Sequence, residues 1–214
     1  MAGDHYFSAQ PSGELVARPL TVTLAGRELT LQTAGGVFSP GGLDVGTGVL
    51  LGHVPPPPPS GDLLDLGCGW GPIALTLALE SPHATVWAVD INERARELTR
   101  RNAALLGLDN VRVAAPDEVP DDVRFMTIWS NPPIRIGKNE LHGMLDAWLP
   151  RLREAADAWL VVARNLGSDS LQRWMDDRYR GELAVSRFAT HKGFRVLRVR
   201  NRTGLTGAIS TIPD

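Results

Sequence analysis

Short apolar runs alternate with helical patterns along most of the chain, and this alternation limits the fold more than any other feature. The runs typical of buried strands cover residues 63–66, 85–89, 111–115, 125–129 and 158–163. The helical patterns between and after them include residues 72–80, 92–106 and 171–179. Strands that are apolar throughout belong to parallel sheets with helices on both faces. Because crossovers in such sheets are right-handed, the pattern predicts a doubly wound α/β fold, similar to a Rossmann fold.

Two further patterns lie in the second half of the chain. The spacing of five apolar residues predicts one face of a helix, which we expect Pro150 to kink. These residues are Leu141, Leu145, Trp148, Leu152 and Ala155. Residues 183–188 and 194–199 predict a closing antiparallel hairpin.

The N-terminal part differs from the alternating pattern. Residues 15–39 predict a β-hairpin that turns at Ala25-Gly26-Arg27, and residues 43–53 predict a short helix. The five prolines Pro55 to Pro59 must be extended, so we interpret them as a stiff connector. We therefore expect an extension over residues 1–54 and a core over residues 60–214, which together form one globular unit.

Composition excludes several classes of protein. A chain of 214 residues with 43% hydrophobic content is long enough for one domain with a substantial core. The net charge of -2 does not suggest a general nucleic-acid binder, although it leaves room for a local basic face. One cysteine permits no disulfide framework, which fits a reducing cytoplasm. The five histidines lack the spacing of metal ligands, so we expect no metal site. The sequence also predicts neither a signal peptide nor a membrane-spanning segment.

A glycine-rich loop, Asp65-Leu66-Gly67-Cys68-Gly69-Trp70-Gly71, joins the first core strand to its helix. Gly67 and Gly69 allow positive φ angles and let a ligand approach the backbone closely. Asp90 ends the second strand, where its carboxylate can accept both hydroxyl groups of a ribose. The loop alone could be a plain tight turn. A strand before it, a helix after it and an acid at this distance together predict a ligand that contains a nucleoside.

The loop also indicates which kind of nucleoside-containing ligand would bind there. A dinucleotide fingerprint reads GxGxxG, whereas this loop reads GxGxG and follows the acidic residue Asp65. A carboxylate there would repel a pyrophosphate but suits a ligand with an ammonium group and a sulfonium. We expect Cys68 to be a small buried residue of the loop, because no neighbouring base would activate it as a nucleophile. These features resemble the signature of class I methyltransferases that use S-adenosylmethionine (AdoMet).

The sequence Asn131-Pro132-Pro133 ends the fourth strand, at the same sheet edge as the glycine loop. An exocyclic amino group is a poor nucleophile, because its lone pair is delocalised. Two fixed acceptors for its hydrogens, the side-chain oxygen of Asn131 and the carbonyl of Pro132, can make it reactive. Asn-Pro is also a common turn dipeptide. Its place beside the glycine loop and Asp90 favours the catalytic interpretation.

An NPP sequence after a strand is typical of amino-group methyltransferases, which act on adenine, on guanine amino groups or on glutamine amides. Within them, the chain resembles the small-domain family typified by ribosomal RNA small-subunit methyltransferase C, which methylates guanine in rRNA. The resemblance rests on residues 5–12, 36–51, 65–75, 130–138 and 191–201. It covers nearly the whole chain, and matches the catalytic half of the two-domain members or their shorter single-domain relatives. We expect the additional N-terminal domain of the larger members to be absent.

The resemblance implies AdoMet as cofactor, S-adenosylhomocysteine as product, and no metal. It implies that the N-terminal extension packs over the cofactor site. It places Asp44 and Thr47 near the methionine part, although Asp44 could equally cap the helix that follows it. Asp117 is a candidate for the adenine ring, with Pro116 as the alternative occupant of that position. The implied cofactor contacts are Phe38, Ser39, Asp44, Thr47, Asp65, Gly67, Cys68, Gly69, Asp90, Ile91, Asp117 and Asn131.

On the substrate side, the implied catalytic residues are Asn131, Pro132, Pro133 and Ile134. Many relatives have an aromatic residue at the last of these positions, whereas Ile134 can pack against a base but cannot stack on it. Arg135 and Lys138 are candidate substrate contacts. Further candidates for RNA contact in the closing hairpin are His191, Lys192, Arg195, Arg198, Arg200 and Arg202.

The function implied is methylation of guanine N2 in small-subunit (16S) rRNA, with rRNA or the small ribosomal subunit as partner. Two alternatives stay open. One is methylation of a glutamine amide in a protein such as a release factor, although the N-terminal segments favour the rRNA group. The other is a non-catalytic, AdoMet-binding ribosome-assembly factor, against which the intact Asn131 and Asp90 argue.

Overall fold

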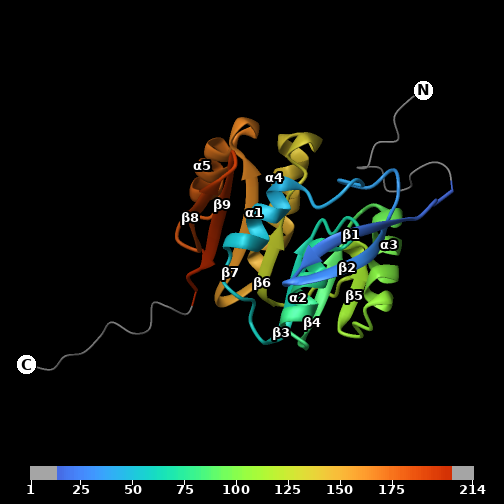
Figure 1. Ribbon diagram of the computed structural model, residues 1–214. Coiled ribbons are helices and arrows are strands. Elements are labelled where there is room, and N and C mark those ends of the chain that lie inside the picture. The colour runs from blue at the N-terminus through green and yellow to red at the C-terminus, as the bar shows by residue number, and fades with distance from the viewer. Residues whose placement is uncertain (1–13, 204–214) are drawn as a thin grey trace, which may run out of the picture.

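A seven-stranded sheet forms the centre of the computed structural model, which describes residues 14–203 (Figure 1). Its strands are β3 (Ser60–Leu66), β4 (His83–Val89), β5 (Val111–Ala114), β6 (Phe125–Ser130), β7 (Leu152–Ala163), β8 (Leu183–His191) and β9 (Phe194–Asn201). The helices are α1 (Val45–His53), α2 (Pro72–Glu80), α3 (Glu93–Leu105), α4 (Lys138–Trp148) and α5 (Ser168–Arg178). Single 3₁₀ turns are η1 (Pro116–Glu118), η2 (Ile134–Ile136), η3 (Leu149–Arg151) and η4 (Arg164–Leu166).

The strand order is β5-β4-β3-β6-β7-β9-β8. Strands β3 to β7 are parallel, whereas β9 runs antiparallel between β7 and β8. After β3 the chain builds outward to β5 and then returns to place β6 on the other side of β3. The switch point of the sheet therefore lies between β3 and β6, where open α/β sheets bind ligands. The predicted doubly wound fold with a closing hairpin is confirmed.

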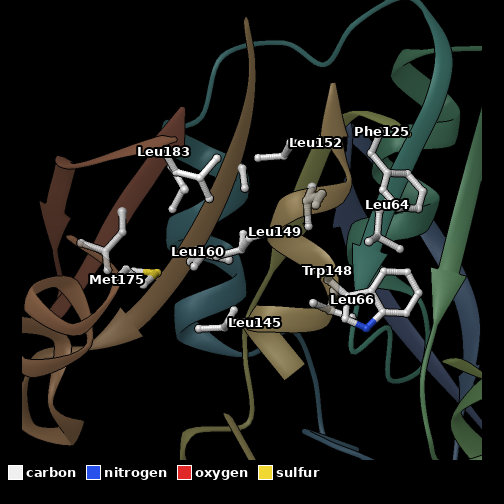
Figure 2. Close-up of a cluster of buried hydrophobic side chains, with 14 of the residues drawn as sticks. Leu64, Leu66, Phe125, Leu145, Trp148, Leu149, Leu152, Leu160, Met175 and Leu183 are labelled. Carbon is white, nitrogen blue, oxygen red and sulfur yellow. The ribbon is translucent and has the colours of Figure 1, made fainter. Parts of the chain in front are cut away.

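The two faces of the sheet bury separate hydrophobic clusters, as expected for strands that are apolar throughout. Leu63 packs with residues of α1 and α2, whereas its neighbour Leu64 packs with residues of α4 and α5 on the opposite face. Figure 2 shows part of the second cluster, in which Leu64, Phe125 and Trp148 lie close together. Successive side chains of a strand point to opposite faces, so both leucines are fully buried.

The N-terminal hairpin consists of β1 (Arg18–Leu24) and β2 (Arg27–Thr33). Its turn residues Ala25 and Gly26 both have positive φ, as a type I′ turn requires. The buried residue Asn102 of α3 attaches the hairpin to the core. Its side chain accepts a hydrogen bond from the backbone nitrogen of Gln32 at 2.7 Å and donates to the carbonyls of Gln32 and Trp70, both at 2.9 Å. The predicted hairpin is confirmed.

The prediction that a helix continues past Pro150 is wrong. Helix α4 ends at Trp148, the turn η3 follows, and strand β7 begins at Leu152, six residues before the predicted start at residue 158. Proline cannot donate the hydrogen bond that would continue the helix, so Pro150 ends the helical segment and does not kink it. Leu152 pairs with Phe125 of β6, and both side chains are buried in the same hydrophobic cluster. Ala155 lies in β7 with a positive φ.

Candidate active site

A cavity of about 1160 Å³ opens at the carboxyl edge of the sheet, at the switch point. Its walls come from the segments that follow β3, β4, β6 and β7, and from residues 37–40 of the N-terminal extension. Residues of this edge that line it include Leu66, Gly67, Gly69, Val89, Asp90, Asn131, Pro132, Val161 and Ala163. Neighbouring parallel strands end side by side, so motifs far apart in the sequence meet here.

Backbone hydrogen bonds fix the glycine loop against the end of β4. The nitrogens of Gly67 and Cys68 donate to the carbonyl of Val89 at 2.8 and 3.0 Å. Gly67 and Gly69 have φ angles of 84° and 58°, and a Cβ atom at either position would meet nothing within 4 Å. The loop thus presents bare backbone to open space along the cavity wall. A flat ligand can approach it closely there.

The carboxylate of Asp90 lines the same wall. Its Oδ2 accepts a hydrogen bond from the nitrogen of Gly69 at 3.0 Å, and its Oδ1 accepts one from the nitrogen of Asn92 at 2.9 Å. Burial raises the pKa of Asp90, and these backbone bonds lower it in part. Each oxygen keeps lone-pair capacity for a hydroxyl group. An open glycine cradle beside an oriented carboxylate fits the nucleoside part of AdoMet.

Asp65 lies beneath the loop and outside the cavity wall. It is fully buried, its Oδ2 accepts a hydrogen bond from the nitrogen of Ala74 at 2.9 Å, and its Oδ1 has no partner among the described residues. Burial raises the pKa of Asp65 well above its usual value. Asp65 therefore joins β3 to the start of α2. Its expected contact with the ammonium group of AdoMet stays a prediction.

Asn131 follows β6 and faces the cavity. The hydroxyl of the preceding Ser130 donates to the carbonyl of Leu66 at 2.6 Å, which aligns the end of β6 with the end of β3. The side-chain nitrogen of Asn131 donates to Oδ2 of Asp44 at 2.8 Å and to Oγ1 of Thr47 at 3.0 Å. Since both of these contacts use the amide nitrogen, the amide oxygen of Asn131 is left for the cavity. Asp44 and Thr47 thus fix the orientation of the carboxamide.

Asp44 also caps α1, because its Oδ2 accepts a hydrogen bond from the nitrogen of Thr47 at 3.0 Å. The capping alternative raised by the sequence is therefore present in the structure. Proximity of Asp44 and Thr47 to the methionine part of AdoMet stays a prediction. Asp44 lines the main cavity, and Thr47 lines a small adjoining cavity together with Asn131.

The two prolines form an inverse γ-turn. Pro133 has φ -75° and ψ 75°, and the nitrogen of Ile134 donates to the carbonyl of Pro132 at 2.8 Å. A carbonyl oxygen has two lone pairs, so that of Pro132 can accept a second hydrogen bond. Pro132, Pro133 and Ile134 all line the cavity. The stiff turn therefore keeps the Pro132 carbonyl in place near Asn131.

The other predicted residues fall into two groups. Those that line the main cavity are Phe38, Ser39, Ile91 and Arg135, and the indole nitrogen of Trp70 holds this part of the extension by donating to the carbonyl of Ser39 at 3.2 Å. Those that lie outside it are Cys68, Asp117 and Lys138. Cys68 is buried against the small adjoining cavity, and burial raises the pKa of its thiol. Pro116 lines the cavity in the place considered for Asp117.

The structure adds a wall that sequence reasoning missed. Its residues come from α4, from η4 after β7, and from the start of β9: Glu140, Met144, Trp148, Asn165, Leu166 and Phe194. Asn165 could have been found, because it also follows the end of a core strand. The residues of α4 carry no motif, and only the path of the chain after the γ-turn brings them to the cavity.

Two findings concern the described part of the chain as a whole. Within residues 14–203, no helix is long and apolar enough to cross a membrane. Over the same residues, no group of three or more His, Cys, Asp or Glu side chains could hold a metal ion.

The sheet order, the glycine loop at the switch point and the acid that ends β4 define a class I AdoMet-dependent methyltransferase. The chain belongs to the methyltransferase small domain family, which it matches over residues 28–198. This confirms the family expected from the sequence. The segment 5–12 that contributed to the resemblance lies outside the described residues.

Relatives of known sequence agree with this assignment. The chain is 30% identical over 200 residues to the Bacillus subtilis protein named Uncharacterized protein YbxB, covering 92% of this chain and 98% of that one. It is 34% identical over 151 residues to ribosomal RNA small subunit methyltransferase C of Stutzerimonas stutzeri, covering 70% of this chain and 45% of that enzyme. The enzyme of the same name from Aeromonas hydrophila is 39% identical over 125 residues, with 58% and 36% covered. The chain thus spans less than half the length of these methyltransferases.

A solved structure shares the fold. The T. thermophilus 16S rRNA N2 methyltransferase, solved with AdoMet and guanosine, superposes with a TM-score of 0.74 at 22% identity. The match covers 89% of this chain and 52% of that one.

Proposed function

We propose that this protein transfers the methyl group of AdoMet to an exocyclic amino group, and that this group is N2 of a guanine in small-subunit rRNA. The observation that carries the proposal is the orientation of Asn131. Its amide nitrogen is bound by Asp44 and Thr47, so its oxygen is presented to the cavity as an acceptor. The rRNA methyltransferases among the relatives support the substrate.

Bound AdoMet would supply an electrophilic methyl group on a sulfonium, held along the glycine loop and Asp90. The residues of the chain prepare the nucleophile. Asn131 Oδ1 and the Pro132 carbonyl accept the two hydrogens of the amino group, which turns the nitrogen lone pair out of the base plane and toward the methyl group. Transfer would form a nitrogen–carbon bond and break the sulfur–carbon bond of AdoMet, and S-adenosylhomocysteine would be the leaving group. Neither oxygen is basic enough to retain the proton that the product nitrogen loses, so this proton passes to water.

The magnitudes favour positioning as the main contribution of the protein. A typical hydrogen bond contributes about 0.5–1.5 kcal/mol net, so two acceptors alone supply little. Alignment of two reactants can supply roughly 7–11 kcal/mol. The stiff γ-turn at Pro133 and the bonds that fix Asn131 serve this alignment. They hold the acceptors in place before the substrate binds.

The division of the chain fits this mechanism. We infer that the extension over residues 1–54, of which 14–54 are described, covers the cofactor and supplies the residues that orient Asn131. The core over residues 60–214, described to 203, supplies the glycine loop, Asp90 and the NPP turn. The two parts meet in one hydrophobic cluster that joins Leu24 and Leu31 to Leu75 and Leu98. They therefore act as one unit.

Methyl transfer to three candidate substrates tests the proposed function. Purified protein is incubated with tritiated AdoMet and, separately, naked 16S rRNA, small ribosomal subunits, and release factor. We expect label in rRNA or subunits, and nucleoside analysis should identify it as N2-methylguanosine. Label in release factor alone would replace the substrate with a glutamine amide. No label in any substrate, with AdoMet binding intact, would favour the non-catalytic alternative.

Substitution of Thr47 tests how Asn131 is oriented. Thr47→Val removes one of the two acceptors of the Asn131 amide nitrogen while keeping the side-chain shape. One hydrogen bond is worth about 0.5–1.5 kcal/mol, so we expect kcat to fall roughly 2- to 12-fold. Thr47→Ser keeps the hydroxyl and should restore kcat. The KM for AdoMet should change little in either variant, and a loss confined to that KM would contradict an orienting role.

A further inference from the structure

Four arginines of the closing hairpin are engaged within the protein, and three of them, Arg195, Arg198 and Arg200, are among the RNA contacts that the sequence offered. Arg202, also offered, follows the far end of β9 and joins no ion pair among residues 14–203. Arg198 and Arg200 both pair with Asp157, each at 2.8 Å. Arg187 and Arg195 both pair with Asp169. Each carboxylate therefore serves two guanidinium groups of the β8–β9 hairpin. An RNA phosphate would therefore have to compete with a carboxylate for each of these four arginines.

A different set of cations lies at the edge of the sheet where the cavity opens. These edge cations are Arg135, Lys138, Arg164 and Lys192. All four are exposed, and none belongs to an ion pair within residues 14–203. No carboxylate would need to be displaced before they could bind a phosphate.

The path of the chain brings the edge cations together. Arg135 lines the cavity just after the NPP turn, and Lys138 begins α4 three residues later. β6 and β7 end side by side, with Ser130 opposite Leu160, so Arg164 follows the neighbouring strand end. The nitrogen of Arg164 donates to the carbonyl of Gly193 at 2.9 Å, which places the β8–β9 turn and its Lys192 beside it.

The lining of the cavity carries a net negative charge, since Arg135 is its single lysine or arginine. Asp44, Asp90 and Glu140 all line it. A phosphate group would be repelled from this interior and attracted to the edge, whereas an uncharged base could enter. The charge distribution therefore separates the two parts of a nucleotide, the base and its backbone. It fits an extruded base whose flanking phosphates stay outside.

We propose that Arg135, Lys138, Arg164 and Lys192 bind the RNA backbone on either side of the methylated nucleotide, and that the hairpin arginines do not. This inference rests on the proposed function, because it takes RNA as the substrate that enters the cavity. Strands with splayed bases are the form in which proteins reach individual RNA bases. The edge cations would position such a strand and leave recognition of the base to the cavity.

The dependence of RNA binding on salt tests the edge cations. Each cation that neutralises a phosphate of a single strand adds about 0.7 to the slope of log K against log[salt]. The double variant Arg164→Gln/Lys192→Gln should therefore lower the magnitude of this slope by roughly 1.4. The measurement is filter binding of radiolabelled 16S rRNA transcript over a range of KCl concentrations.

Two variants serve as matched controls. Arg153→Gln removes an exposed cation of β7 near the opposite edge of the sheet, and Arg198→Gln removes a paired hairpin cation. Both should leave the slope unchanged. An unchanged slope in the double variant, or an equal decrease with Arg198→Gln, would overturn the proposal, as would wild-type protein that binds the transcript without salt dependence. Binding with the expected slopes, but no methyl transfer to either rRNA or small subunits, would support the edge cations and reject the proposed function.

Discussion

Asn131→Ala should abolish most methyl transfer while leaving AdoMet binding intact. The substitution removes the acceptor that Asp44 and Thr47 orient toward the cavity. Because the amino group loses its alignment together with this acceptor, the cost should exceed that of an ordinary hydrogen bond. Loss of one preorganised polar group at a reacting centre typically lowers kcat by about 10²- to 10³-fold, and we expect a loss of this order. The glycine loop and Asp90 are untouched, so the affinity for S-adenosylhomocysteine should stay close to that of the wild type. Single-turnover methyl transfer and calorimetry measure the two quantities.

Asn139→Ala is the matched control for this experiment. Asn139 is an exposed amide in the first turn of α4, close to the NPP turn in sequence, and does not line the cavity. Its substitution should leave kcat unchanged. A kcat for Asn131→Ala within a few-fold of the wild type would remove Asn131 from the mechanism. A thermal unfolding curve establishes that each variant is folded.

Asp90→Ala should weaken AdoMet binding strongly. We propose that the carboxylate, oriented by the nitrogens of Gly69 and Asn92, accepts the ribose hydroxyls. A hydrogen bond to a charged group is worth about 1.5–3 kcal/mol. Calorimetry should therefore show a dissociation constant raised by roughly 10- to 150-fold. Asp90→Asn keeps one acceptor oxygen, so its dissociation constant for AdoMet should lie between those of the wild type and of Asp90→Ala. The control variant Asp109→Ala changes an exposed carboxylate away from the cavity and should bind AdoMet like the wild type. If Asp90→Ala also bound AdoMet as tightly as the wild type, the ribose contact would be excluded.

The same residue predicts how binding depends on pH. Burial raises the pKa of Asp90 in the folded protein, so its carboxylate becomes protonated at a higher pH than an ordinary aspartate. AdoMet affinity should be greatest above this raised pKa and should fall as the pH is lowered through it. The Asp90→Asn variant cannot titrate at this position and should lack that decrease. An identical profile in both proteins would assign the decrease to another group.

The ends of the parallel strands were the most predictable part of the site. Gly67, Asp90 and Asn131 each follow an apolar run, and adjacent parallel strands must place such residues at one edge. The start of β7 was less predictable, because Leu152 and Ala155 continue a helical spacing across Pro150 by coincidence. The partners of the hairpin arginines could not be predicted from the sequence, since Asp157 and Arg198 are 41 residues apart in the chain. Pairing at that separation depends on the register of the sheet.

The contact of Asn131 with Asp44 and Thr47 also has a consequence for how the protein becomes active. The amide of Asn131, for which we propose a catalytic role, belongs to the core, whereas Asp44 and Thr47, which orient it, belong to the N-terminal extension. The proline connector at residues 55–59 joins the two segments. The proposed active site therefore forms only where the extension contacts the core. A core that folds alone would possess the NPP turn without a defined direction for its amide. Enzymatic turnover would then report docking of the extension, and a chain cut within the connector could recover activity only when its two fragments reassociate.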